Sequence, residues 1–144
     1  MPTVTELKKA LVGAGFEVYR TRGDTIWLAD RVRENLLMDA GVFVRVEAAG
    51  LVVGVVCRAQ RSEFPGEDEA SLFARARTLV GPAIERGYVE AGADVQRVLD
   101  PSDASRTLDV WCEVRAEIRA GDPAAAIEAL RFAVSMQKAA APAT

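Results

Sequence analysis

The strongest constraint on the fold is a stretch at 108–119 in which apolar and polar residues alternate without a break. Successive side chains of a β-strand point to opposite faces of a sheet, so this period of two predicts a long strand with one buried face and one open face. The apolar set is Leu108, Val110, Cys112, Val114, Ala116 and Ile118, and the polar set is Asp109, Trp111, Glu113, Arg115, Glu117 and Arg119.

Two β-hairpins are predicted earlier in the chain. Residues 16–20 and 25–29 alternate around the turn-forming Arg22-Gly23-Asp24, and residues 42–47 and 51–59 flank Ala48-Ala49-Gly50. The strand at 51–59 is apolar on both faces near its middle, which favours a central place in the sheet. Residues 95–99 begin a further strand, which a turn at 100–103 joins to 108–119. Residues 30–39 satisfy neither period and predict a short helix or an irregular third strand.

Three helices complete the prediction. Thr3 and Glu6 have capping-box spacing before a helix at 4–13. Three acids at 67–69 begin a second helix that extends to 87, and Pro82 predicts that it bends or ends near 80–81. Asp122 as N-cap and Pro123 at the first helical position begin the last helix, and the tail at 139–144 is expected to fray.

Hairpins without βαβ crossovers predict the α+β class. We expect one domain over 1–144, with an antiparallel sheet of about five or six strands and helices packed on one face. The element order is α-β-β-(x)-β-β-α-β-β-α, where x is the ambiguous segment. A chain of 144 residues is long enough to bury one core.

Composition excludes several functions. The chain has no histidine, so it lacks the commonest acid–base group and every histidine-containing metal site. Cys57 and Cys112 are too few for a four-cysteine metal site and too far apart for a CxxC motif, and strand parity predicts two buried, reduced thiols. A net charge of −3 argues against nucleic acid as a partner. We therefore expect no cofactor, no metal, no nucleic acid and no membrane partner, and a cytoplasmic protein.

The order of elements resembles that of class I type III secretion chaperones and the YbjN-like domains related to them in fold. The resemblance covers most of the chain and is carried by the helix at 3–13, the strands that end at Cys57-Arg58-Ala59, the acidic-started helix at 67–87, and the strand at 108–119 before Asp122-Pro123. It implies a non-catalytic, often dimeric cytoplasmic protein that binds other proteins. The extra strand around 32–38 departs from the chaperone pattern.

The candidate partner-binding residues are Trp111, Glu113, Arg115, Trp27 and Phe43. Trp111 lies on the predicted open face, with Trp27 and Phe43 expected on the same side, and exposed aromatic residues flanked by arginine are typical of interfaces. The competing interpretation is that a neighbouring strand or the 30–39 segment covers them. We expect a protein partner and a homodimer, bound through the open sheet face or a sheet edge.

The alternative function is a small-molecule sensor or enzyme with a pocket between helices and sheet. It would rely on carboxylates, arginines and Tyr19 or Tyr88. Other acidic residues have simpler explanations: Asp100, Asp103 and Asp109 are typical turn formers, and the acids at 67–69 suit a helix start that can form a charge network with Arg58 and Arg61.

Overall fold

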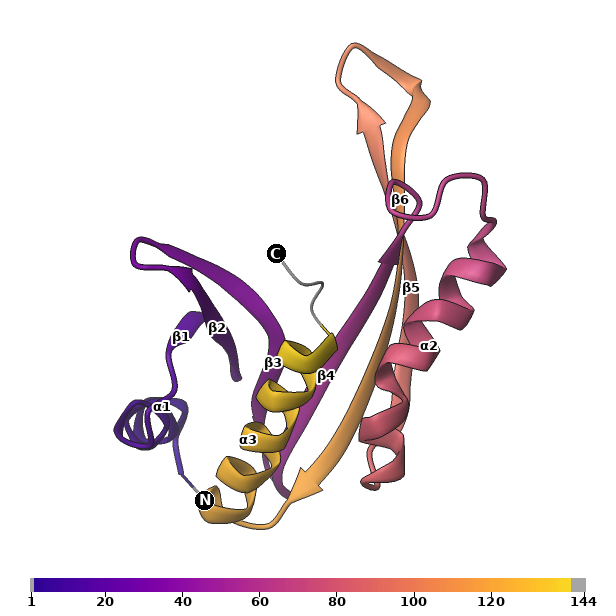
Figure 1. The fold of residues 1–144 in the computed structure, drawn as a ribbon. Coiled ribbons are helices and arrows are strands. Elements are labelled where there is room, and N and C mark those ends of the chain that lie inside the picture. The colour runs from indigo at the N-terminus through magenta and orange to yellow at the C-terminus, as the bar shows by residue number, and fades with distance from the viewer. Residues whose placement is uncertain (1, 141–144) are drawn as a thin grey trace. The chain divides into compact units, whose positions relative to one another are not determined.

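A computed structural model describes residues 2–140 and confirms the predicted α+β class. Three helices accompany a six-stranded antiparallel sheet whose strand order is β1-β2-β3-β4-β6-β5. The elements, drawn in Figure 1, are α1 (Val4–Gly13), β1 (Val18–Arg22), β2 (Thr25–Arg33), β3 (Leu36–Glu47), β4 (Gly50–Gln60), α2 (Glu69–Glu85), β5 (Val89–Asp100), β6 (Asp103–Ala120) and α3 (Pro123–Ala140).

The chain divides into two compact units. Unit 1 comprises 1–55 together with 117–144, and unit 2 comprises 56–116. Strands β4 and β6 each contribute residues to both units. The sequence predicted a single domain, and this division was not anticipated from it.

In unit 1, helices α1 and α3 begin at the predicted caps. The hydroxyl of Thr3 accepts a hydrogen bond from the Glu6 amide at 3.1 Å, and the Glu6 carboxylate accepts one from the Thr3 amide at 3.2 Å. The Asp122 carboxylate accepts a hydrogen bond from the Ala125 amide at 2.8 Å, just before α3. Both helices bury their apolar stripes in a core with strands β2 to β4. Its fully buried members include Leu7, Leu11, Ile26, Val42, Val44, Leu51, Val53 and Leu130.

The ambiguous segment at 30–39 is strand, not helix. Strand β2 continues to Arg33 and β3 begins at Leu36, so the two form one hairpin. Its pairing register shifts between Trp27 and Ala29, and Gly41 nearby has a φ of 69°. Such irregularities change which face successive side chains occupy, which is why the sequence showed no clean period of two.

In unit 2, α2 covers the apolar face of its strands. Its N-cap Asp68 accepts a hydrogen bond from the Ser71 amide at 2.8 Å. Leu72 from α2 packs in one buried cluster with Ala59, Val110 and Cys112. Pro82 predicted that α2 bends or ends near 80–81, and the second of these outcomes is wrong, because the helix continues through Pro82 to Glu85. Val80 and Ala83 are both buried, and this burial on either side of Pro82 stabilises the last turn against the missing backbone donor.

Strands β5 and β6 form a long hairpin joined at Pro101 and Ser102. Strand β5 begins at Val89, six residues before the predicted start at 95. Helix α3 includes Ala139 and Ala140, so these two residues of the expected frayed tail are helical, and 141–144 lie outside the described residues. None of the helices within 2–140 is both long and apolar enough to cross a membrane.

Candidate functional site

Trp111 lies on the face of the unit 2 strands that points away from α2. Its neighbours in β6, Val110 and Cys112, are buried in the cluster beneath α2, so strand alternation directs Trp111 and Glu113 to the opposite face. Within 56–116, all of which the structure describes, α2 is the only helix. The open face predicted for the 108–119 strand therefore exists in this unit, and Trp111 is half-buried on it.

Arg58 from β4 covers one side of the Trp111 ring. The guanidinium carbon lies 4.3 Å from the ring centroid, a cation–π contact. The same guanidinium holds the Glu113 carboxylate, with Nη2 at 2.9 Å and Nε at 3.0 Å from Oε1. The Arg58 side chain is 44% exposed and that of Glu113 is 16% exposed. Arg58, Trp111 and Glu113, called the Trp111 cluster below, are therefore ordered by their mutual contacts.

Hydrogen bonds also fix the indole nitrogen of Trp111. Trp111 Nε1 donates to Asp109 Oδ2 at 3.2 Å, and Asp109 accepts further hydrogen bonds from the Ser62 amide at 3.1 Å and the Ser62 hydroxyl at 2.9 Å. The Gln60 side chain, with its amide oriented so that both polar atoms are satisfied, presents its oxygen to the same indole N–H and its nitrogen to Glu63. Desolvation raises the pKa of Asp109, but the hydrogen bonds from Ser62, Val110 and Trp111 outweigh it and lower that pKa.

Arg115, another predicted partner-binding residue, lies along β5. Its Nη2 donates to the Ala91 carbonyl at 3.2 Å. A Cβ added to Gly92 would lie 3.0 Å from the same nitrogen, so the guanidinium packs closely over the backbone of β5 at Gly92. Arg115 thus makes an internal contact between β6 and β5 in addition to its place on the open face.

Trp27 and Phe43 belong to unit 1, where they pack against each other across β2 and β3 with ring centroids 4.8 Å apart. The expectation that Phe43 is an exposed aromatic residue does not hold, because only 2% of it is accessible. Phe43 pairs across the strands with Gly54, and its ring occupies the space that a Gly54 side chain would need. Trp27 is half-buried, with the Arg20 guanidinium 5.7 Å from its ring centroid.

Cys57 and Cys112 are both buried free thiols, as strand parity predicted. Burial raises the pKa of Cys57 to about 11. It also raises the pKa of Cys112, whose thiol donates to the Glu69 carbonyl at 3.7 Å. A nucleophilic or metal-binding role requires the thiolate, so neither cysteine is suited to one in the folded protein.

The other acidic residues considered from the sequence form hydrogen bonds and ion pairs with nearby groups. Asp100 accepts hydrogen bonds from the amide and hydroxyl of Ser102, and Asp103 does the same for Ser105. At the start of α2 the expected network with Arg58 and Arg61 is replaced by other pairs: Arg75 binds Glu67 at 2.6 Å, and Arg97 binds Glu69 at 2.8 Å. Among residues 2–140, no three histidine, cysteine or acidic side chains gather closely enough to hold a metal ion.

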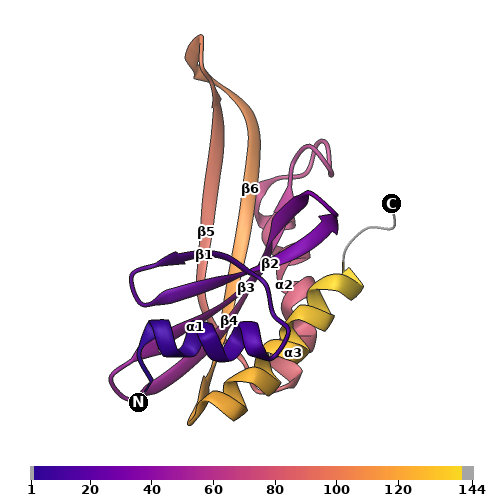
Figure 2. The ribbon, with the colours of Figure 1, turned by 90° about the vertical axis from the view of Figure 1, so that its left-hand side faces the viewer.

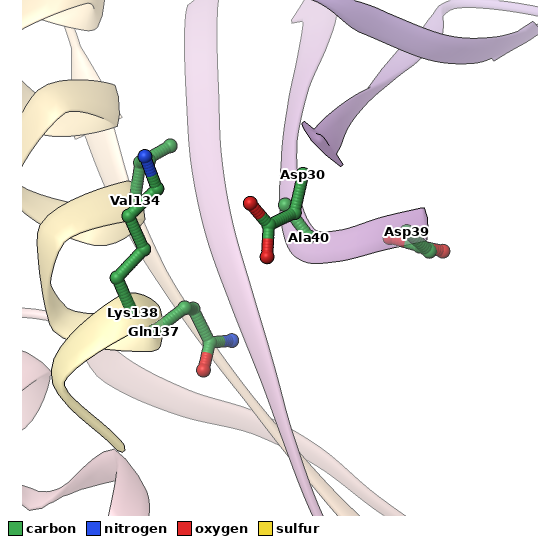
Figure 3. A pocket seen from close by; sticks show the side chains of 6 residues that line it. All are labelled: Asp30, Asp39, Ala40, Val134, Gln137 and Lys138. Atoms are coloured by element: carbon green, nitrogen blue, oxygen red, sulfur yellow. The ribbon is translucent and has the colours of Figure 1, made fainter. Parts of the chain in front are cut away.

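The alternative function required a pocket between helices and sheet, and unit 1 contains a small one. It has a volume of about 190 Å³ and lies between α3 and strands β2 and β3. Figure 3 shows Asp30 pointing from the strands toward the helix, and Asp39 pointing away. Its lining residues are Asp30, Asp39, Ala40, Val134, Gln137 and Lys138. Ligand sites usually enclose about 300–1,000 Å³, and a neighbouring opening lined by β2, α3 and the loop before β1 has a volume of about 290 Å³, so both pockets lie below the usual size.

Neither tyrosine named for that alternative lines this pocket. Tyr88 is buried in unit 2, and desolvation raises its pKa to about 12, so it holds its proton at neutral pH. Tyr19 is 43% exposed on β1.

Trp111 and Glu113 were named as candidate site residues from the sequence. The contacts that Arg58, Gln60 and Asp109 make with Trp111 were not foreseen. One signal was available for Arg58: it alternates with Cys57 and Ala59, which places it on the open face of its own strand. The register between β4 and β6, which brings Arg58 beside Glu113, was not visible in either strand alone.

In comparisons with known proteins, no protein-family model, no curated protein and no solved structure matches this chain.

Proposed function

We propose that this chain is a non-catalytic protein-interaction module, of chaperone-like or adaptor type, that works in the cytoplasm. It binds its partner protein through the open face of the unit 2 strands, with the Trp111 cluster at the centre of the contact. The observation that carries the proposal is a half-buried tryptophan held in one orientation by a stacked arginine and a hydrogen-bonded ring nitrogen.

Physical arguments support this role for the cluster. Tryptophan and arginine are enriched among the residues that dominate binding energies. The Trp111 ring and the Arg58 guanidinium are already ordered by Glu113 and Asp109, so binding costs little side-chain entropy. Arg58 and Glu113 neutralise each other, which favours a partner that offers an apolar side chain to the indole and hydrogen-bonding groups to its rim.

The test compares three forms of the tagged protein in a pull-down from the lysate of its source, read by mass spectrometry. These are the wild type, Trp111→Asp, and Val32→Asp as a matched control at an exposed valine of unit 1. Circular dichroism and thermal melting confirm that each form is folded. We expect a partner that the wild type and Val32→Asp retain and that Trp111→Asp loses.

The affinity for the purified partner is then measured by calorimetry. Truncation of a central interface residue costs at least about 2 kcal/mol, so Trp111→Ala should weaken binding by about 30-fold. Arg58→Lys keeps the charge but loses the planar stack, and it should cost less than Trp111→Ala. A partner that binds folded Trp111→Asp as well as wild type, or a wild type that retains no specific protein, would overturn the proposal.

A further inference from the structure

Helix α3 of unit 1 carries a groove on its side toward strands β2 and β3. The helix packs along β3, and α1 contacts both α3 and β2, as Figure 2 shows. The Arg131 guanidinium of α3 donates to the Ala14 carbonyl at 3.3 Å, so the turn between α1 and β1 is tied to the helix. This turn, the two strands and the last turns of α3 form the walls of the groove, called the α3 groove below.

Two adjoining openings make up the α3 groove. The pocket of about 190 Å³ and its neighbour of about 290 Å³ share Asp30, Val134 and Lys138 in their linings. The larger opening extends from these residues over Phe16 and Leu28. A water molecule takes up about 30 Å³ in the liquid, so the larger opening holds a molecule of about nine or ten non-hydrogen atoms. The size of the groove therefore restricts it to a small ligand.

Two groups of opposite charge in the α3 groove are left unpaired. Figure 3 shows the Asp30 carboxylate directed from the strands toward α3, and the Lys138 side chain running along the helix past Val134. Among residues 2–140, neither the Asp30 nor the Lys138 side chain has a hydrogen-bond or ion-pair partner, and the two do not pair with each other. Asp30 is half-buried, so its carboxylate has lost part of its hydration without gaining a partner.

The other polar side chains of the groove are already held by contacts within the chain. Glu17 and Arg31 pair at 2.7 Å, Asp39 accepts a hydrogen bond from the Gly41 amide at 2.9 Å, and Gln137 donates one to the Gly41 carbonyl at 3.0 Å. Asp30 and Lys138 are therefore the two charged groups that the groove offers to a ligand.

We propose that the α3 groove binds a free α-amino acid with an apolar side chain. The ammonium group of the ligand meets the Asp30 carboxylate, its carboxylate meets the Lys138 ammonium, and its side chain lies on the apolar floor of the groove. The groove belongs to unit 1 and the Trp111 cluster to unit 2, so this binding site goes beyond the proposed function.

The charges and the floor of the groove select this class of ligand. An amine or a carboxylic acid alone would pair one of the two charged groups and leave the other without a partner, whereas an amino acid pairs both. The floor favours an apolar side chain, because Leu28 is buried and Phe16 and Val134 are half-buried. Lys138 also lies in the last turn of α3, where a cation complements the helix dipole, but this role gives no partner to Asp30.

The test is a titration of the full chain with L-leucine and with L-valine, followed in amide NMR spectra. We expect saturable binding at millimolar concentrations that moves the resonances of residues 28–31 and 134–138. Two analogues of L-leucine are matched controls: L-leucinamide lacks the carboxylate, and isocaproate lacks the ammonium group. Each analogue should bind about tenfold more weakly than L-leucine or worse, because each loses one charged hydrogen bond.

Variants then show which side chain meets which charge. Lys138→Gln should weaken L-leucine binding by about tenfold and leave L-leucinamide binding unchanged, because this analogue has no carboxylate. Asp30→Asn should weaken the binding of both. Lys8→Gln, at an exposed lysine of α1 outside the groove, should change neither. Circular dichroism shows whether each variant is folded, and Lys138→Gln with the two analogues carries the test if Asp30→Asn does not fold.

Three results would overturn the proposal: neither L-leucine nor L-valine binds saturably, either analogue binds as tightly as L-leucine, or folded Lys138→Gln binds L-leucine as tightly as the wild type.

Discussion

Gly54 is the position at which a single methyl group should do most damage. The ring of Phe43 crosses over Gly54 on the neighbouring strand, and a Cβ built on Gly54 would overlap three atoms of that ring, the farthest of them, Cε2, at 2.7 Å. The ring has little freedom to move, since Trp27 packs on it at 4.8 Å and the Arg45 guanidinium lies 5.8 Å from its centroid. We predict that Gly54→Ala destabilises the protein by displacing Phe43.

The magnitude follows from two opposing contributions. Overpacking a well-filled core costs about 1–3 kcal/mol, and the overlap of three ring atoms puts Gly54→Ala at the upper end. Replacing a strand glycine by alanine otherwise gains about 0.5–1 kcal/mol through the unfolded state. The net cost in the free energy of unfolding should be about 2 kcal/mol. Phe43→Ala alone should cost about 3–5 kcal/mol by leaving a cavity.

The decisive assay is a double-mutant cycle measured by urea denaturation, with far-UV circular dichroism and tryptophan fluorescence as probes. In the Phe43→Ala background the space above Gly54 is empty, so adding Gly54→Ala should be neutral or stabilising by up to about 1 kcal/mol. The coupling energy between the two positions should therefore be about 2–3 kcal/mol.

Gly81→Ala provides the control for glycine replacement as such. Gly81 lies in α2, and apart from its chain neighbours and the helix's own backbone no atom comes within 4 Å of its added Cβ, so alanine should stabilise the helix there. If the costs of Gly54→Ala and Phe43→Ala simply add, or if Gly54→Ala alone costs less than about 0.5 kcal/mol, the packing of Phe43 on Gly54 is not the reason for the glycine.

Three further predictions concern local features. Gly81→Ala should raise the free energy of unfolding by about 0.5–1 kcal/mol, measured by urea denaturation, and a decrease would contradict the open space seen there. Thr3→Ala removes the N-cap of α1 and should cost about 1 kcal/mol, whereas Thr3→Ser should keep most of it; equal losses would show that the hydroxyl does not cap the helix. Because the pKa of Cys57 is raised to about 11 in the folded state, the unfolded chain loses this proton first, and stability should fall as pH rises from about 9 to 11. Cys57→Ala should show a smaller fall over that window in pH-dependent denaturation, and an unchanged slope would refute the assignment.

Local sequence predicted most of the elements because their signals lie within a few residues of one another. The capping box at Thr3 and Glu6 and the N-cap at Asp122 gave the starts of α1 and α3. The alternation at 108–119 gave the greater part of β6 and the burial of Cys112. Pro82 did not end the helix, which continues through it to Glu85 with buried residues on both sides.

The sequence predicted only part of the candidate site. Parity placed Trp111 and Glu113 on the open face of β6 correctly, because parity is a property of one strand. Parity also placed Phe43 on a polar face, but the glycine opposite it on β4 opens space for the ring, and Phe43 is buried there. Which residue lies opposite another is decided by register between strands that are distant in sequence.

By itself, then, the sequence determined the α+β class, the order of the elements and the side of each regular strand on which an apolar residue lies, because hydrophobic period and end caps act over a few residues. Only the tertiary structure decided the pairing of Arg58 with Glu113 beside Trp111, the packing of Phe43 on Gly54 and the extension of the β5–β6 hairpin beyond the end of β4. These depend on register, strand length and the end of a covering helix, which are set when distant segments pack together.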